Sequence, residues 1–316
     1  MDIESFPALL EQVSDEIGKV VFGSQESIRL MTIAVLVKGH LLLEGPPGVA
    51  KTLLVRAFSR CLGLDTRRVQ CTPDLMPGDV LGANIFDFKS QQFSLNQGPV
   101  FTEFLLVDEI NRTPPKTQSA LLEAMQERSV TIDGVTYKLS ELFTVMATQN
   151  PLEHEGTYPL PEAQLDRFLF QLNISYPDSE QELQAVLAHC QNAGMPEVDP
   201  VQPLLDRETL ATIQALPEQV RVEPDVAKYA VELARATREH RSLAVGISPR
   251  ATTMLVAACR GAAVCEGRNY IVPYDVKSLF LSAVRHRVIL SPAAEMDGSS
   301  IDDILLEVSE HVPVPR

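Results

Sequence analysis

Residues 41–52 read LLLEGPPGVAKT, and this stretch indicates how the chain folds. The apolar run at 41–43 has the composition of a buried strand, and it stops at a cluster of glycines and prolines. A helix is expected to begin at Lys51, so the cluster forms a loop between a strand and a helix. Backbone N–H groups and the positive end of that helix would then point at an anion held in the loop.

The loop follows the phosphate-binding pattern G-x-x-x-x-G-K-[ST] with one departure, because Ala50 stands where the last glycine is usual. Alanine is tolerated there at negative φ and is strained otherwise. Lys51 would reach the β- and γ-phosphates, and the Thr52 hydroxyl would bind Mg²⁺. The alternative is a Gly-Pro turn followed by an exposed lysine. The predicted nucleotide contacts are Gly45, Pro46, Pro47, Gly48, Val49, Ala50, Lys51, Thr52 and Leu53.

A second apolar run ends in two acids, in the stretch FLLVDEINR at 104–112. Ligands bind beyond the carboxyl ends of parallel strands, so these acids can meet the phosphate loop. Asp108 would hold Mg²⁺, and Glu109 would orient and polarise the attacking water. The alternative is that both acids only favour the start of a helix at Pro114-Pro115. Together the two motifs predict ATP and Mg²⁺ as ligands.

The remaining pattern predicts the architecture. Apolar runs at 69–71, 143–147 and 168–172 alternate with helices, which indicates a parallel sheet in a three-layer α/β arrangement. After Tyr176-Pro177 the chain is predicted to be all helix, with prolines at 224, 249 and 273 opening helices. We therefore expect an α/β nucleotide-binding domain at 1–176 and a smaller helical domain at 177–316.

Composition excludes several classes of protein. The 316 residues carry a formal net charge of -15, which disfavours nucleic acid as a partner. Five cysteines without a Cys-x-x-Cys motif suit reduced thiols better than disulfides or zinc. The sequence contains no apolar run long enough to span a membrane, and its acidic start lacks the pattern of a secretory signal, so a cytoplasmic location is expected.

The segments GPPGVAKT and LLVDEINR resemble the AAA+ superfamily and within it the MoxR family, over nearly the whole chain. The resemblance implies a P-loop α/β domain followed by a helical lid. Ala50 is usual in the MoxR version of the loop. The stretch VFGSQ at 21–25 resembles the segment near the adenine, which adds Phe22 and Gly23 to the nucleotide contacts.

Three further segments resemble catalytic motifs of the family: ATQNP at 147–151, EAQLDRF at 162–168 and SPRA at 248–251. By this resemblance Asn150 is sensor 1, which helps Glu109 to place water. Arg167 is the arginine finger for a neighbouring subunit, the alternative being a surface pair with Asp166. Arg250 is sensor 2, in its own or a neighbouring subunit, and the role of Arg112 stays open.

Two insertions resemble the branch that includes magnesium chelatase motor subunits. Val130–Ile132 and Val135–Tyr137 flank Asp133-Gly134, which predicts a hairpin at about 129–138 like the pre-sensor-1 insertion. An irregular segment at about 72–99 resembles the helix-2 insertion. In the family both approach the ring's central opening, and the alternative for each is a surface excursion.

These resemblances imply a ring, expected to have six copies, that hydrolyses ATP to ADP and phosphate. Hydrolysis would drive chaperone-like remodelling of a client protein, or insertion of a cofactor or metal into it. A protein with a von Willebrand factor A domain, encoded elsewhere, is the expected partner. The alternatives are a chelatase-type motor subunit and a nucleotide-switched scaffold with little hydrolysis; a helicase is disfavoured by the acidic charge.

Overall fold

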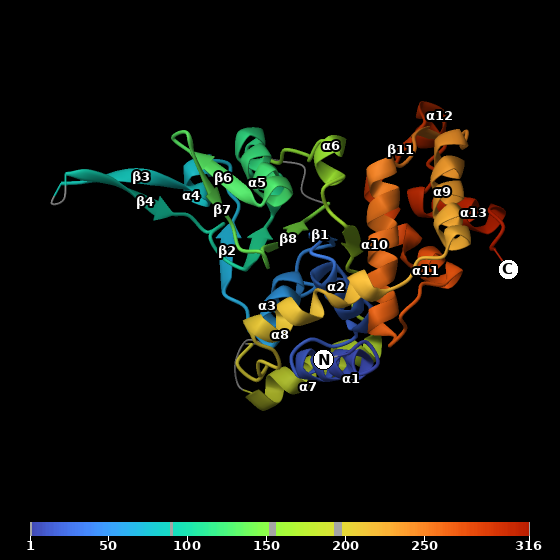
Figure 1. The fold of residues 1–316 in the computed structure, drawn as a ribbon, viewed down its shortest axis with the longest axis horizontal. Helices are drawn as coiled ribbons and strands as arrows, with labels where there is room; N and C mark the ends of the chain where they lie inside the picture. The colour runs from blue at the N-terminus through green and yellow to red at the C-terminus, as the bar shows by residue number, and fades with distance from the viewer. Residues whose placement is uncertain (1, 89–90, 152–155, 193–197, 316) are drawn as a thin grey trace.

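The central feature of the computed structural model, which describes residues 2–88, 91–151, 156–192 and 198–315, is a parallel sheet (Figure 1). Its five strands run in the order β2-β5-β8-β1-β9, and every pairing between them is parallel. The strands are β2 (Thr66–Gln70), β5 (Phe104–Asp108), β8 (Thr144–Gln149), β1 (Leu41–Glu44) and β9 (Phe170–Asn173). The predicted parallel α/β fold is confirmed.

Helices cover both faces of this sheet because alternate strand residues point to opposite sides. Leu41 and Leu43 belong to the larger core, which they share with the helices that precede and follow β1. Leu42 belongs to a second core on the other face. The helices of the first face are α1 (Phe6–Gly18), α2 (Gln25–Leu36) and α3 (Lys51–Cys61), and α5 (Pro115–Glu127) covers the second.

After β9 the chain is almost entirely helical. It first passes α7 (Ser179–Asn192) and α8 (Arg207–Ile213), and α8 packs against α1 and α3. The lid follows, and it consists of α9 (Pro224–Glu239), α10 (Pro249–Cys265), α11 (Pro273–Val284), α12 (Pro292–Met296) and α13 (Ile301–His311), with the short pair β10 (Leu243–Val245) and β11 (Ile289–Leu290). The remaining short helices are α6 (Glu162–Leu165) and the 3₁₀ turns η1 (Ile110–Arg112), η2 (Leu216–Gln219) and η3 (Arg285–Arg287).

Prolines open the three long lid helices as predicted, since a missing N–H costs nothing in the first turn. The lid packs beside α2 and the edge strand β9 (Figure 1). The boundary at residue 177 stays a prediction. Within the described residues, no helix has both the length and the apolar character needed to cross a membrane.

Two hairpins leave the sheet on the α5 side. The first is β6 (Ser129–Ile132) with β7 (Val135–Lys138), and its turn residues Asp133 and Gly134 both have positive φ, as an Asp-Gly hairpin requires. The second lies in the segment 72–99: α4 (Pro77–Leu81) leads into β3 (Gly82–Asp87), which pairs with β4 (Gln92–Gln97). This pair projects far from the body (Figure 1). Asn84 donates to the Asp133 carboxylate at 2.8 Å, so the hairpins touch.

Strand β2 begins earlier than the apolar run at 69–71 indicated. Its first three residues, Thr66, Arg67 and Arg68, are exposed because β2 is the sheet's edge and has only one neighbouring strand. Charged side chains on an edge strand discourage pairing with other chains. Because these residues are polar, the apolar run in the sequence begins only at Val69, after the strand has already started.

His40 is a buried link between the start of β1, strand β8 and helix α5. The backbone N–H of Val145 donates to its Nδ1 at 3.0 Å, so Nε2 carries the proton and donates to the Met125 carbonyl at 3.1 Å. Burial lowers the pKa of His40 to about 4. The neutral ring therefore belongs to the native structure.

We expect acid to destabilise the fold through His40. Between about pH 6.5 and 4 the unfolded chain binds a proton at His40 that the native chain does not, so the free energy of unfolding falls by up to about 3 kcal/mol as pH drops through this window. Urea unfolding measured at several pH values checks this. The His40→Gln variant should show a shallower pH dependence than the wild type across the window, and equal slopes would contradict the assignment.

Candidate nucleotide-binding site

A cavity of about 520 Å³ lies at the carboxyl edge of the central sheet, where the phosphate loop and the acidic motif meet. Helix α3 opens at Lys51, directly after the loop that follows β1. The residues lining the cavity are Pro47, Gly48, Val49, Ala50, Lys51, Thr52, Leu53, Arg56, Arg68, Gln70, Asp108, Glu109, Thr148, Gln149 and Asn150. The two motifs thus share one cavity, as their places at the carboxyl ends of parallel strands predicted; β8 lies between the two strands that carry them.

Asp108 is the buried centre of this cavity. Its side chain is 4% exposed, and the hydroxyls of Thr52 and Thr148 donate to its Oδ1 at 3.0 and 3.3 Å. The guanidinium of Arg68 donates to Oδ2 at 2.6 Å. The carboxylate therefore does not serve the start of α5, which was the alternative interpretation, but connects three strands and the phosphate loop.

The chemistry of these groups fits Mg²⁺. A hard cation prefers oxygen ligands, and the Thr52 hydroxyl and the Asp108 carboxylate lie within hydrogen-bond distance of each other. A carboxylate this deeply buried needs a positive partner. Arg68 supplies one from a side chain that is 52% exposed.

Glu109 sits at the rim in the left-handed region, with φ 58°. Its backbone N–H donates to Thr148 Oγ1 at 3.0 Å, which ties it to the end of β8. Gln70 and Arg112 donate to its Oε2 at 2.9 and 3.1 Å. These contacts hold the carboxylate at the cavity wall, beside Asn150 at the end of the neighbouring strand.

The phosphate loop is stabilised by its own lysine. The Lys51 ammonium donates to the carbonyls of Gly45 and Pro46. These two residues are not among those lining the cavity, and their contact with a nucleotide stays a prediction. Ala50 has φ 59° and ψ 23°, so it adopts the left-handed conformation in which a Cβ is unfavourable. The departure from glycine is thus a source of local strain.

The structure adds cavity residues that the sequence analysis missed. Arg68 and Gln70 come from β2, whose register places Gln70 opposite Asp108, and Arg56 comes from the exposed side of α3. The buried run of β8 ends in the polar residue Thr148, a pattern from which the sequence could have predicted a site residue. No comparable signal marks Arg68 or Gln70, because only strand pairing brings them to the acids.

Phe22 and Gly23, predicted to lie near the adenine, are not among the residues lining this cavity. Gly23 has φ 71°, a conformation that favours glycine, and the Gln181 amide of α7 lies 2.2 Å from where a Cβ would sit. This contact joins the α1–α2 connection to α7. The adenine role of both residues stays a prediction.

Arg167 and Arg250 lie elsewhere, in a cavity of about 260 Å³ at the amino edge of the sheet. Lys38 and Gly39, just before β1, and Arg128, at the end of α5, line it with them. The Arg128 guanidinium is occupied by the backbone carbonyls of Lys38, Glu141 and Phe143. Among the described residues we find no acidic side chain lining this cavity, so it suits an anion.

The predicted alternative of a surface pair between Asp166 and Arg167 does not occur. Asp166 instead pairs with the buried Arg287 of η3, with 2.8 Å between Oδ1 and Nε. Within the described part of the chain, no ion pair or hydrogen bond engages the Arg167 side chain. Its charge faces the cavity that it shares with Arg250.

A cavity larger than the nucleotide cavity, of about 710 Å³, opens between the carboxyl edge and the lid. Glu44, Gln149 and Gln171 line its sheet side, and Gln149 and Gln171 both donate to the Glu44 carboxylate. Its lining residues include neither the phosphate loop nor Asp108 and Glu109. Size alone therefore does not locate the nucleotide site.

Replacing Ala50 with glycine should stabilise the protein. Glycine removes a strain of about 1 to 2 kcal/mol at positive φ but costs roughly 0.5 to 1 kcal/mol of backbone entropy, so the free energy of unfolding should rise by about 0.5 to 1 kcal/mol. Urea unfolding measures it. Ala185→Gly in the exposed helix α7 is the matched control and should cost about 1 kcal/mol. A loss of stability in Ala50→Gly would show that the loop is not strained.

Comparison with known proteins agrees with this geometry. A model of the ATPase family associated with various cellular activities matches residues 40–170, which span the sheet and both motifs. A model of the AAA lid domain matches residues 235–308. The crystal structure of a candidate ATPase from Cytophaga hutchinsonii superimposes with a TM-score of 0.89 at 38% identity, covering 98% of this chain and 96% of that one.

Three relatives match over nearly their full length. Chaperone MoxR1 of Mycobacterium tuberculosis is 41% identical over 97% of this chain and 82% of its own. Protein MoxR of Methylorubrum extorquens is 36% identical over 95% and 93%, and the uncharacterized protein YeaC of Bacillus subtilis is 43% identical over 99% and 97%. With the α/β domain, the phosphate loop and the helical lid in place, this chain belongs to the MoxR family of AAA+ ATPases.

Proposed function

We propose that this chain hydrolyses ATP at the carboxyl edge of its sheet and that each site is completed by the arginines of a neighbouring copy in a ring, expected to have six members. The observation that carries the proposal is the separation of the two cavities. Lys51, Asp108, Glu109 and Asn150 share one end of the parallel strands, and Arg167 and Arg250 share the other.

The separation is too large for the arginines to serve their own subunit in this conformation. Strand β1 leads from Gly39 and His40, in the arginine cavity, to the phosphate loop. Its four residues span about 13 Å at roughly 3.3 Å per residue. A second copy that docks its amino edge on the carboxyl edge of the first brings the two halves together. Such a head-to-tail contact forms a ring when the rotation between successive copies closes, and we propose that it does here.

The chemistry follows from the placement of each group. Lys51 would hold the phosphates, and Thr52 and Asp108 would hold Mg²⁺, which would neutralise negative charge on the phosphates. Glu109 and Asn150 flank the water that attacks the γ-phosphate. Arg167 of the neighbour meets the negative charge that spreads over the phosphoryl oxygens, and Arg250 supports it. A group acting only in the transition state raises the rate without changing ATP affinity.

The energy of hydrolysis is proposed to drive chaperone-like remodelling of a client protein, including insertion of a cofactor or metal. The projecting β3–β4 hairpin, joined to the β6–β7 hairpin through Asn84 and Asp133, reaches away from the nucleotide domain and is suited to contact such a client. A von Willebrand factor A domain protein remains the proposed partner. A cytoplasmic setting fits the four buried free cysteines, Cys61, Cys71, Cys259 and Cys265.

Arg167→Ala should bind ATP normally and lose turnover by about 10³-fold or more, because the variant lacks the charge that stabilises the neighbour's transition state. Phosphate release and nucleotide affinity measure the two effects separately. Arg235→Ala removes an exposed arginine that pairs with Glu239 on α9, and it should retain wild-type turnover. Wild-type turnover in Arg167→Ala would exclude Arg167 as the finger.

The specific activity of the wild type should rise with protein concentration and then level off as rings form, since every site needs a second copy. Phosphate release at saturating ATP, measured beside the mass from light scattering, tests this. Activity independent of concentration in a range where the mass changes would contradict the shared site.

Glu109→Gln should bind ATP with near-normal affinity and hydrolyse it at least about 10²-fold more slowly, because the amide cannot accept the proton of the attacking water. Single-turnover hydrolysis measures the chemical step directly. Lys51→Ala should instead lose ATP affinity. Unchanged single-turnover hydrolysis in Glu109→Gln would favour the alternative of a scaffold whose nucleotide acts as a switch.

A further inference from the structure

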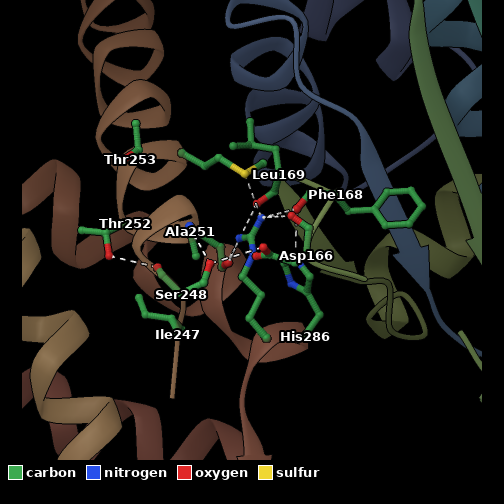
Figure 2. Close-up of polar contacts among 12 residues, drawn as sticks. Asp166, Phe168, Leu169, Ile247, Ser248, Ala251, Thr252, Thr253 and His286 are labelled. Atoms are coloured by element: carbon green, nitrogen blue, oxygen red, sulfur yellow. Dashed lines mark hydrogen bonds and ion pairs between the residues drawn. The ribbon is translucent and has the colours of Figure 1, made fainter. Parts of the chain in front are cut away.

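A buried polar network lies directly behind the two arginines of the amino edge. Asp166 precedes Arg167, and Ser248 lies two residues before Arg250. Figure 2 shows Ser248, at the start of α10, facing the segment that carries Asp166. The Ser248 hydroxyl donates to Asp166 Oδ2 at 3.3 Å and accepts the backbone N–H of Ala251 at 3.0 Å.

Arg287 forms the centre of this network. Its side chain is 2% exposed, and its Nε donates to Asp166 Oδ1 at 2.8 Å. The terminal nitrogens donate to the backbone carbonyls of Asp166, Phe168 and Leu169, and Nη2 also contacts the Met254 sulfur at 3.4 Å. The neighbouring His286 adds a contact of 3.0 Å to the Phe168 carbonyl. One guanidinium thus fixes the backbone on both sides of residue 167.

The network joins parts of the chain that belong to different halves of the molecule. Residues 166–169 lead into β9 of the central sheet, whereas Ser248 and Arg287 belong to the lid. Met254 on α10 of the lid and Leu169 just before β9 both line the arginine cavity. The network therefore ties the Arg167 segment to the lid.

We infer that Asp166, Arg287 and Ser248 are positioning residues that hold Arg167 and Arg250 in one arrangement for the neighbour's nucleotide. The inference rests on the proposed function. A structural role alone does not require the tie. Ser291 caps α12 of the same lid by the same serine contact, with the Ala294 N–H donating to its hydroxyl. Among the described residues, the Ser291 hydroxyl donates no hydrogen bond to the central sheet. Ser248 differs in donating onward to Asp166.

Asp166→Asn should lower kcat by about 10- to 100-fold, since a finger displaced by about 1 Å loses that much rate. The KM for ATP should stay within about twofold, because the variant's own phosphate loop is untouched. Ser248→Ala keeps the Asp166–Arg287 pair and should lower kcat by a smaller factor. Ser291→Ala, the matched control, loses an equivalent helix cap and should keep wild-type kcat. Equal effects of the two serine variants on kcat would overturn the inference.

Mixed rings separate positioning from general damage. Asp166→Asn subunits keep an intact phosphate loop, and Glu109→Gln subunits keep intact arginines, so a one-to-one mixture should form competent interfaces at about a quarter of its sites. Phosphate release should therefore exceed that of either variant alone. A mixture of Asp166→Asn with Arg167→Ala carries both defects on the same edge and should not exceed the activity of Asp166→Asn alone.

A third mixture distinguishes the two proposals. Arg167→Ala with Glu109→Gln tests the shared site itself, and its failure to regain activity would overturn the shared site and the inference with it. If that mixture regains activity and the one of Asp166→Asn with Glu109→Gln does not, the shared site stands and the positioning role is excluded. Recovery in both supports the positioning role.

Discussion

The buried carboxylate of Asp108 is the contact on which the nucleotide site depends. It accepts hydrogen bonds from Thr52 after the phosphate loop, from Thr148 at the end of β8 and from Arg68 on β2. A charge held in a low-dielectric interior is costly unless it is fully paired, so these partners are fixed by the same requirement that makes the site fit a cation. The same carboxylate therefore fixes the geometry of the phosphate loop, of the sheet edge and of the candidate metal site.

The direction of the strands then decides which of the candidate site residues one subunit can bring together. In a parallel sheet all carboxyl ends lie at one edge, so the phosphate loop and the acids are necessarily together. Arg167 precedes β9 and is necessarily at the opposite edge. The chain cannot bring Arg167 to its own nucleotide cavity while the sheet is intact, and the proposed head-to-tail ring would bring Arg167 of one copy to the cavity of the next with no change of fold.

Strain and burial mark the same functional regions. Ala50 and Glu109, on either side of the cavity, both take the left-handed backbone conformation, which most residues avoid. Behind the amino edge, Arg287 gives up nearly all its solvent contact to bind the segment around Arg167. Burying a guanidinium is worthwhile when its fixed fork satisfies several carbonyls and a carboxylate at once. Both features favour a defined geometry over the lowest local energy.

The sequence by itself determined the fold class, the alternation of sheet strands with helices, the phosphate loop, the acidic pair and the family, because these depend on local composition and on the order of motifs. The Asp133-Gly134 hairpin and the prolines that open the lid helices were readable for the same reason. The sequence did not predict the strands β3 and β4 in the segment 72–99 or the β10–β11 pair of the lid. The tertiary structure decided everything that depends on which strands are neighbours: Arg68 and Gln70 beside the acids, the pairing of Asp166 with Arg287, and the shared cavity of Arg167 and Arg250. Long-range pairing sets these contacts, and no spacing along the chain encodes them.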